Sequence, residues 1–126
     1  MNYAETLDYL QELYGMLGYD LGLDRIYALM ESMSNPQDEL KVIHVAGTNG
    51  KGSICSMVSS VLMTAGYKVG VYTSPHLEKY NERITIDGKQ MSDEDFAKYL
   101  TDVKEHCEMI VKNGVGQPTI FEVVTA

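Results

Sequence analysis

Apolar residues recur at helical spacing in five stretches of the chain, which predicts five helices. In the first stretch the residues at this spacing are Tyr3, Leu7, Leu10, Tyr14 and Leu17. Capping and stop signals set their ends: an acidic or hydroxyl residue precedes a helix, and glycine or Asn-Pro follows it. By these signals the helices occupy about residues 3–17, 24–33, 53–65, 92–113 and 119–126.

Two short apolar runs, 41–46 and 68–73, flank the third predicted helix and predict strands. Strand, helix and strand make a βαβ unit, which implies parallel pairing with a right-handed crossover. The connection from residue 74 to 91 lacks helical periodicity, and connections of that length are usually functional or mobile. Within it, Arg83 to Ile86 followed by Asp87-Gly88 predicts a small hairpin.

Composition narrows the class of protein. A chain of 126 residues with 44% apolar residues allows one domain at most, with a real core. The net charge of −8 argues against non-specific binding to nucleic acid or to a membrane surface. No stretch is long and apolar enough to span a bilayer, and the N-terminus lacks a signal pattern. Cys55 and Cys107 have no metal-ligand spacing, so we expect free thiols of a cytoplasmic protein.

A glycine-rich stretch, Gly47-Thr48-Asn49-Gly50-Lys51-Gly52-Ser53, joins the first predicted strand to the third predicted helix. Glycines let backbone N–H groups approach phosphate oxygens, and the helix N-terminus adds partial positive charge. The alternative is a tight turn that binds nothing. It explains Lys51 poorly, because a cation at the positive end of a helix dipole is unfavourable without an anion. We therefore expect phosphate binding, with Lys51 on the β- and γ-phosphates of a nucleotide.

The spacing of this loop departs from the common pattern G-x-x-x-x-G-K-[ST]. Val45 stands where the first glycine should be, and Gly52 stands where the hydroxyl residue should be. An unrelated P-loop ATPase or kinase should keep that spacing and supply an acidic strand, and neither feature is found in the sequence.

Four motifs together resemble a known family. In chain order they are Asp20-Leu-Gly-Leu-Asp-Arg-Ile26, the glycine loop, Tyr72-Thr-Ser-Pro-His-Leu77 with Asn81-Glu-Arg-Ile84, and Pro118-Thr-Ile-Phe-Glu122. In this order and spacing the chain resembles folylpolyglutamate synthase and the related bifunctional dihydrofolate synthase, which are members of the Mur-ligase superfamily. The resemblance covers nearly the whole chain.

The resemblance implies an α/β fold, a P-loop-type three-layer domain with a parallel sheet. Residues 1–126 would be the N-terminal part of this ATP-binding domain. Members of the family are longer and carry a second, C-terminal domain. We therefore expect a fragment that is inactive alone, with an uncovered apolar helix face at Val123-Val124.

The resemblance also implies a site for ATP and Mg²⁺. The family uses the serine of its T-S-P-H-L motif and the glutamate of its last motif as magnesium ligands. Without the resemblance, Ser74 would be a turn residue and Glu122 a favourable charge in a first helical turn. The implied residues are Lys51 for catalysis; Gly47, Thr48, Asn49, Gly50, Lys51, Gly52 and Ser53 for ATP; Ser74 and Glu122 for the metal; and Asp20, Leu21, Gly22, Leu23 and Arg83 for the substrate.

Three further polar residues have simpler interpretations. Arg25 is by default a solvated charge on a helix. His44 alternates on a buried strand and is expected to be a satisfied core histidine. His76 follows Ser74-Pro75, and the resemblance favours an ordering role for it over a catalytic one.

The implied reaction adds L-glutamate to a folate or dihydropteroate carboxylate through an acyl phosphate, at the cost of ATP. The expected partners are these small molecules, with neither nucleic acid nor a membrane, and the full-length enzyme is expected to be a monomer. No sequence pattern separates dihydrofolate synthesis from polyglutamate extension. A different class stays open at this point, a nucleotide-binding module without catalysis.

Overall fold

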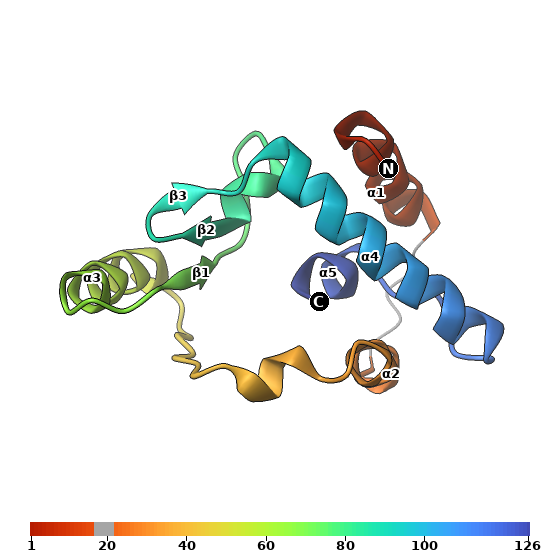
Figure 1. Cartoon of the computed structure of the whole chain (residues 1–126), viewed down its shortest axis with the longest axis horizontal. Coiled ribbons are helices and arrows are strands. Elements are labelled where there is room, and N and C mark those ends of the chain that lie inside the picture. The colour runs from red at the N-terminus through yellow and green to blue at the C-terminus, as the bar shows by residue number, and fades with distance from the viewer. Residues whose placement is uncertain (17–21) are drawn as a thin grey trace. The chain divides into compact units, whose positions relative to one another are not determined.

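The computed structural model describes residues 1–16 and 22–126, and it confirms the α/β class of the fold. Each of the helices predicted from periodicity is present, with ends that shift by a few residues. The helices are α1 (Tyr3–Met16), α2 (Asp24–Ser32), α3 (Lys51–Thr64), α4 (Asp93–Lys112) and α5 (Ile120–Thr125); two 3₁₀ helices span Pro36–Glu39 and Tyr80–Arg83; and the strands are β1 (Gly70–Tyr72), β2 (Ile84–Ile86) and β3 (Lys89–Gln90) (Figure 1).

The chain divides into two compact units. Residues 1–41 and 94–126 form one, here called the helical unit, and residues 42–93 form the other, here called the loop unit. The helical unit contains α1, α2, α5 and nearly all of α4, whereas the loop unit contains α3 and the small sheet.

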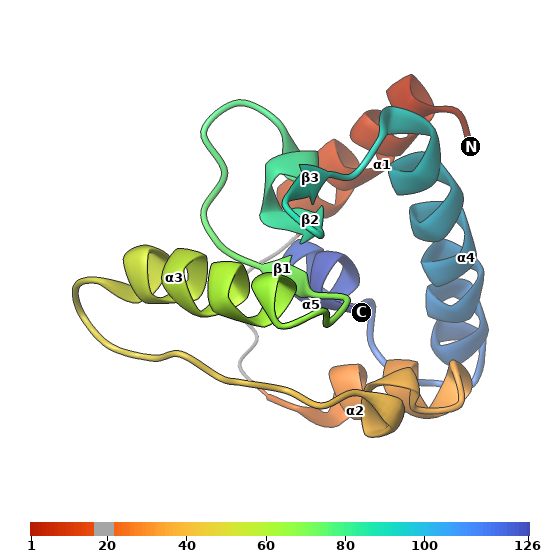
Figure 2. The same ribbon diagram turned by 60° about the vertical axis from the view of Figure 1, so that its left-hand side comes forward.

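The core of the helical unit comes from one face of each of its helices. α4 passes beside α1 in both views, and the rings of Tyr3 and Phe96 meet edge to face with centroids 6.2 Å apart (Figures 1 and 2). The buried apolar side chains are Leu10, Leu13, Leu29, Phe96, Ala97, Leu100, Val103, Cys107, Ile110, Val123 and Val124.

Two expectations about the core are wrong. Val123 and Val124 are 1% and 5% exposed, because α5 packs its apolar face within the helical unit instead of leaving it uncovered. Tyr14, placed on the apolar face of the first helix by its spacing, is 75% exposed. The buried positions of α1 are instead Thr6, Leu10 and Leu13.

The sheet of the loop unit is antiparallel throughout, in the order β1-β2-β3. Val71 pairs with Thr85, and Ile86 pairs with Lys89 across the hairpin. The hairpin turn is Asp87-Gly88, with φ of +49° and +75°. Asp and Gly tolerate this left-handed backbone, which matches the twist of the strands, so the predicted hairpin is confirmed.

Residues 41–73 do not form the predicted parallel βαβ unit, and the three-layer arrangement with a parallel sheet is not found among the described residues. β1 pairs antiparallel with β2, and residues 41–46 form no strand. Val42 and Ile43 are 71% and 62% exposed, and His44 is exposed rather than buried in a core. A strand needs a hydrogen-bonded neighbour, and none of the described strands pairs with residues 41–46.

Both cysteines are free, as expected, with Cys107 buried and Cys55 half-buried. Burial raises the pKa of the Cys107 thiol to about 11. Within residues 1–16 and 22–126, no helix combines the length and the apolar character that a bilayer crossing requires.

Candidate nucleotide and metal site

The glycine loop adopts a backbone that its glycines make possible. Gly47 and Gly50 have φ of +149° and +81°, a region that side chains rarely adopt. Gly50 is the N-cap of α3, so the loop runs directly into the helix N-terminus. The first N–H groups of an α-helix have no partner within the helix, and here no side chain caps them. All residues from Gly47 to Ser53 are exposed, so these donors face solvent.

Lys51 is the first residue of α3, and its side chain folds back over the loop. Its Nζ donates to the carbonyl oxygen of Gly47 at 2.6 Å and to that of Thr48 at 3.3 Å. The first turn of α3 holds no acidic residue. The ammonium and the helix N-terminus therefore add their positive charge at one exposed place, which fits an anion such as the phosphates of ATP.

A cleft of about 350 Å³ lies between α3 and the sheet of the loop unit. Small and hydroxyl residues line it, among them Ser56 and Ser59 of α3 and Thr85 of β2. Gly52 reaches its edge, but residues 47–51 are not part of its lining. The glycine loop is therefore exposed to solvent and borders this cleft through Gly52.

Ser74, the predicted metal ligand, begins the loop that follows β1 and is exposed. The segment behind it is ordered by Glu82, whose carboxylate accepts the N–H groups of Leu77, Glu78 and Lys79 at 2.9, 2.8 and 2.7 Å. These hydrogen bonds, with that from Leu77 the largest contribution, lower the pKa of the Glu82 carboxyl. Glu82 thus fixes the loop between Ser74 and the hairpin.

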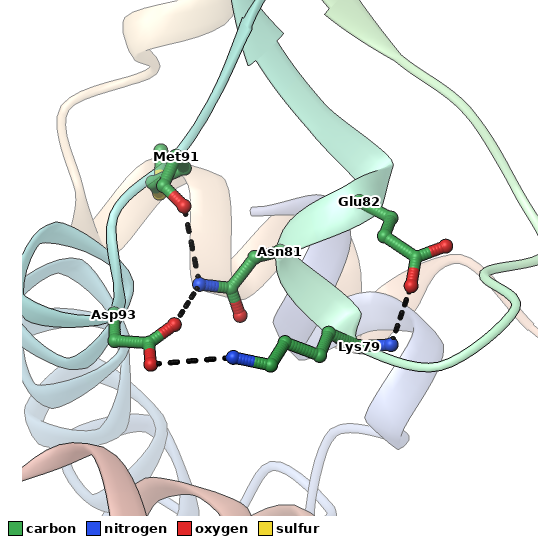
Figure 3. A network of polar contacts seen from close by, with 5 residues as sticks. All are labelled: Lys79, Asn81, Glu82, Met91 and Asp93. Atoms are coloured by element: carbon green, nitrogen blue, oxygen red, sulfur yellow. Dashed lines mark hydrogen bonds and ion pairs between the residues drawn. The ribbon is translucent and has the colours of Figure 1, made fainter.

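Asn81 is fully buried and ties this loop to the start of α4 (Figure 3). Its side-chain amide donates to the carbonyl oxygen of Met91 at 3.2 Å and to Oδ1 of Asp93 at 2.9 Å. The other oxygen of Asp93 lies 3.5 Å from Nζ of Lys79. The sequence did not predict this buried role of Asn81. No local pattern around Asn81 indicates a hydrogen bond to Met91, ten residues further along the chain.

Arg83, a predicted substrate residue, is engaged within the same loop. Its Nε donates to Nδ1 of His76 at 2.9 Å, and its guanidinium carbon lies 5.6 Å from the ring centroid of Tyr80. The His76 and Tyr80 rings have centroids 4.3 Å apart. His76 therefore orders the loop, as the resemblance favoured, and a neutral His76 carries its proton on Nε2.

Glu122, the other predicted metal ligand, lies at the start of α5 in the helical unit. It forms a capping box with Thr119: the Thr119 N–H donates to Glu122 Oε2 at 2.7 Å, and the Glu122 N–H donates to Thr119 Oγ1 at 3.2 Å. Arg25 of α2 also donates to Oε2, with Nε at 3.1 Å. The interpretation of Arg25 as a solvated charge is wrong, since only 11% of its side chain is exposed.

The predicted site residues divide between the two units. The glycine loop, Ser74 and Arg83 belong to the loop unit, whereas Glu122, Gly22 and Leu23 belong to the helical unit; Asp20 and Leu21 lie outside the described residues. The shared metal site of Ser74 and Glu122 therefore stays a prediction. Within the described ranges, no three His, Cys, Asp or Glu side chains gather as a metal site. A hydroxyl and a carboxylate are hard oxygen donors of the kind Mg²⁺ binds together with nucleotide oxygens.

The comparisons with known proteins converge on one kind of enzyme. The chain is 40% identical to the "Dihydrofolate synthase/folylpolyglutamate synthase" of Bacillus subtilis over 116 residues, 90% of this chain and 27% of the relative. It matches the solved folylpolyglutamate synthetase of Lactobacillus casei with a TM-score of 0.89 and 35% identity, over 99% of this chain and 31% of that one. A solved complex described as FPGS-AMPPCP-folate gives a TM-score of 0.88 at 34% identity, over 99% of this chain and 30% of that one. No protein-family model matches.

The exposed glycine loop and the lysine at the start of α3 lie in an α/β segment, and the solved relatives of that segment have the Mur-ligase fold. Among proteins of that fold, the chain belongs to the folylpolyglutamate synthase and dihydrofolate synthase family. It spans 27% of the length of the Bacillus subtilis relative and 31% of the solved Lactobacillus casei chain.

Proposed function

We propose that this chain is the N-terminal part of an ATP-dependent ligase that adds L-glutamate to the carboxylate of a folate or of dihydropteroate. The observation that carries the proposal is the loop Gly47–Ser53, where two left-handed glycines and Lys51 open α3. The relatives support the reaction, since those compared are folylpolyglutamate and dihydrofolate synthases. They do not favour a non-catalytic module or an unrelated P-loop ATPase or kinase.

The loop would bind ATP through its backbone. The N–H groups of Thr48, Asn49, Gly50 and Gly52 would bind phosphate oxygens, and the Ser53 hydroxyl adds a donor close by. The Nζ of Lys51 would leave the carbonyl oxygens of Gly47 and Thr48 for the β- and γ-phosphates. The similarity to an FPGS complex with AMPPCP, an ATP analogue, supports ATP binding.

An amine cannot readily attack a carboxylate, because the oxygen that would have to leave is a poor leaving group. The carboxylate is therefore first activated as an acyl phosphate. A carboxylate oxygen of the folate attacks the γ-phosphorus, the bond to the β,γ-bridging oxygen breaks, and ADP leaves. The amine of glutamate then attacks the acyl phosphate carbonyl, loses a proton and expels inorganic phosphate, which leaves an amide. The protein has to position the groups and stabilise charge, and Lys51 does this at the γ-phosphate.

We propose Ser74 and Glu122 as the residues that would hold Mg²⁺. When bound, the ion neutralises charge on the phosphate oxygens during transfer. The donor set fits, because each residue offers an oxygen: the Ser74 side chain is exposed, and Glu122 is ordered by Thr119 and Arg25.

The folate substrate would contact the segment that contains Asp20, Leu21, Gly22 and Leu23, together with Arg83. Arg83 would act from an ordered loop, since His76 and Tyr80 fix its guanidinium. The solved FPGS complex with folate supports the substrate class. We further propose a cytoplasmic monomer, and we expect the 126-residue chain alone to be inactive.

The decisive experiment is Lys51→Ala in the full-length enzyme, with Lys68→Ala as a matched control. Lys68 is an exposed lysine of the same unit, just before β1, and is not part of the loop. We expect Lys51→Ala to lower kcat by about 100-fold or more, since a lost contact to the transferring phosphate costs about 3 kcal/mol. Lys68→Ala should keep normal turnover. ADP release that depends on both folate and glutamate is the measurement, and near-normal turnover of a folded Lys51→Ala enzyme would contradict the proposal.

A further inference from the structure

The Glu122 carboxylate is held by one oxygen only. Oε2 accepts from the Thr119 N–H and from Nε of Arg25, at 2.7 and 3.1 Å. For Oε1 the structure records no hydrogen bond from any residue that it describes, whereas Oε2 has two donors. The two oxygens of the same carboxylate are thus in different environments.

The ion pair is a buried, long-range contact. The side chains of Arg25 and Glu122 are 11% and 10% exposed, and the two residues are 97 positions apart in the sequence. Arg25 belongs to α2 and Glu122 to α5, so the contact joins two helices. The Arg25 stem passes Gly116, where an added Cβ would lie 3.7 Å from Cδ. Gly116 therefore leaves room for the Arg25 stem to reach Glu122.

A capping box alone does not need this arginine. Thr119 caps α5 (Ile120–Thr125) through two hydrogen bonds. Its hydroxyl accepts the Glu122 N–H, and its N–H donates to the Glu122 carboxylate. A buried ion pair is weak evidence for stability, because desolvation of the two charges offsets their attraction. The contact with Glu122 therefore has room for a second role, and Oε1, which accepts no hydrogen bond from the described residues, offers one.

We propose that Arg25 is a positioning residue for the metal-binding carboxylate: it fixes Oε2 of Glu122 and so leaves Oε1 available to Mg²⁺. This inference rests on the proposed function, because it requires Glu122 to be a metal ligand. Residues that orient a metal ligand through a hydrogen bond typically change metal affinity by about 10–100-fold when they are removed. Arg25 makes a contact of this kind, since its Nε donates to one carboxylate oxygen of Glu122 at 3.1 Å.

The test compares Arg25→Ala, Arg25→Met, Arg25→Lys, Thr119→Val and Glu122→Gln in the full-length enzyme. Mn²⁺ is the probe, and its binding in the presence of a non-hydrolysable ATP analogue is measured by electron paramagnetic resonance. Thr119→Val is the matched control: it removes the hydroxyl that caps α5 but keeps the backbone N–H and Arg25 on Oε2. Metal-free affinity for the analogue and Tm are measured in parallel.

We expect Arg25→Ala to weaken Mn²⁺ binding by about 10-fold or more, with metal-free nucleotide affinity unchanged. Arg25→Lys should recover part of that loss, since an ammonium can still donate to Oε2. Thr119→Val should lower Tm while Mn²⁺ affinity stays normal. Equal Mn²⁺ affinities in Arg25→Ala and Thr119→Val would overturn the inference. If Arg25→Ala does not fold, Arg25→Met decides, because it keeps an apolar stem but removes the donor to Oε2: wild-type Mn²⁺ affinity in that variant would overturn the inference as well.

Glu122→Gln separates the two proposals. If this variant binds Mn²⁺ as the wild type does, Glu122 is not a ligand, and the proposed metal site fails together with the inference. If Glu122→Gln loses Mn²⁺ and Arg25→Ala does not, the metal site stands and only the role of Arg25 is rejected. A wild-type enzyme that binds Mn²⁺ but releases no ADP with folate and glutamate would reject the reaction alone.

Discussion

The two units of this chain are stabilised by different means. In the described part of the helical unit, apolar side chains from α1, α2, α4 and α5 are buried, Leu10, Leu29 and Phe96 completely. In the loop unit, residues 42–93, the buried side chain is Asn81, and the apolar residues Met57 and Val61 of α3 are 61% and 68% exposed. One unit depends on apolar packing and the other on turns, capping and hydrogen bonds.

This difference bears on the site. The phosphate loop and Ser74 belong to the unit with little apolar core, whereas Glu122 belongs to the packed unit. Regions with few buried apolar contacts open locally at low free energy, and binding loops are drawn from such regions. Polar anchors such as Asn81 and Glu82 therefore have to supply order that packing supplies elsewhere.

The difference between the two units predicts that truncating a core side chain has the largest effect on the free energy of unfolding. Phe96→Ala in the helical unit should lower the free energy of unfolding by about 3–5 kcal/mol, because it removes a fully buried ring. Val61→Ala in the loop unit should change it by less than about 0.5 kcal/mol, because the side chain is 68% exposed. Urea denaturation of the 126-residue chain measures both. Equal effects would contradict the distinction between the units.

A smaller effect is expected from the polar anchor of the loop unit. Asn81→Ala leaves the Met91 carbonyl and Asp93 without their amide donor, which should cost about 1–3 kcal/mol. Faster amide hydrogen exchange at Thr73 is the local sign, because its N–H bonds to the carbonyl oxygen of Arg83 in this loop. Gln90→Ala, an exposed change in the same hairpin, is the control. Unchanged exchange at Thr73 would show that Asn81 is not an anchor.

The smallest expected effect is a dependence of the order of the Leu77–Lys79 segment on pH, through Glu82. The pKa of Glu82 is lowered in the folded chain, chiefly by the N–H of Leu77 and then by those of Lys79 and Glu78. Its contribution to stability is therefore fully present above the ordinary pKa of a glutamate and is lost as pH falls through the lowered value. Amide exchange of Leu77 to Lys79, corrected for intrinsic rates, should rise in that acid range in the wild type. Glu82→Gln should show the faster exchange already at pH 7, and a pH-independent profile in the wild type would reject this role.

Local signals in the sequence were enough for much of the fold. The hairpin follows from Asp87-Gly88, and the ends of α3 and α4 follow from Gly66 and Gly114, which both have positive φ. The prediction of a strand at 41–46 is wrong for a physical reason. Its apolar residues can form a strand only if another strand pairs with them, and none of the described strands does. Pairing is a property of distant residues, so no local pattern settles it.

The candidate site divides in the same way. The glycine loop is local, and its shape could be predicted from Gly47, Gly50 and Lys51 alone. Arg25 could not be assigned, because its spacing on α2 is equally suited to a surface charge. Its partner Glu122 is far along the chain, and neither residue carries a signal for the other. Contacts of this kind are visible only once helices are packed.

The long-range contacts of the helical unit also set an order in time. Arg25 cannot meet Glu122, and the amino group of Met1 cannot reach Thr101 at 2.8 Å, until residues 94–126 have been synthesised. Residues 42–93, whose pairings are local, leave the ribosome earlier and can form their hairpin first. The first helices therefore remain with their apolar faces unpaired while residues 42–93 have already been synthesised. A chaperone that recognises exposed apolar helices would meet α1 and α2 in that interval.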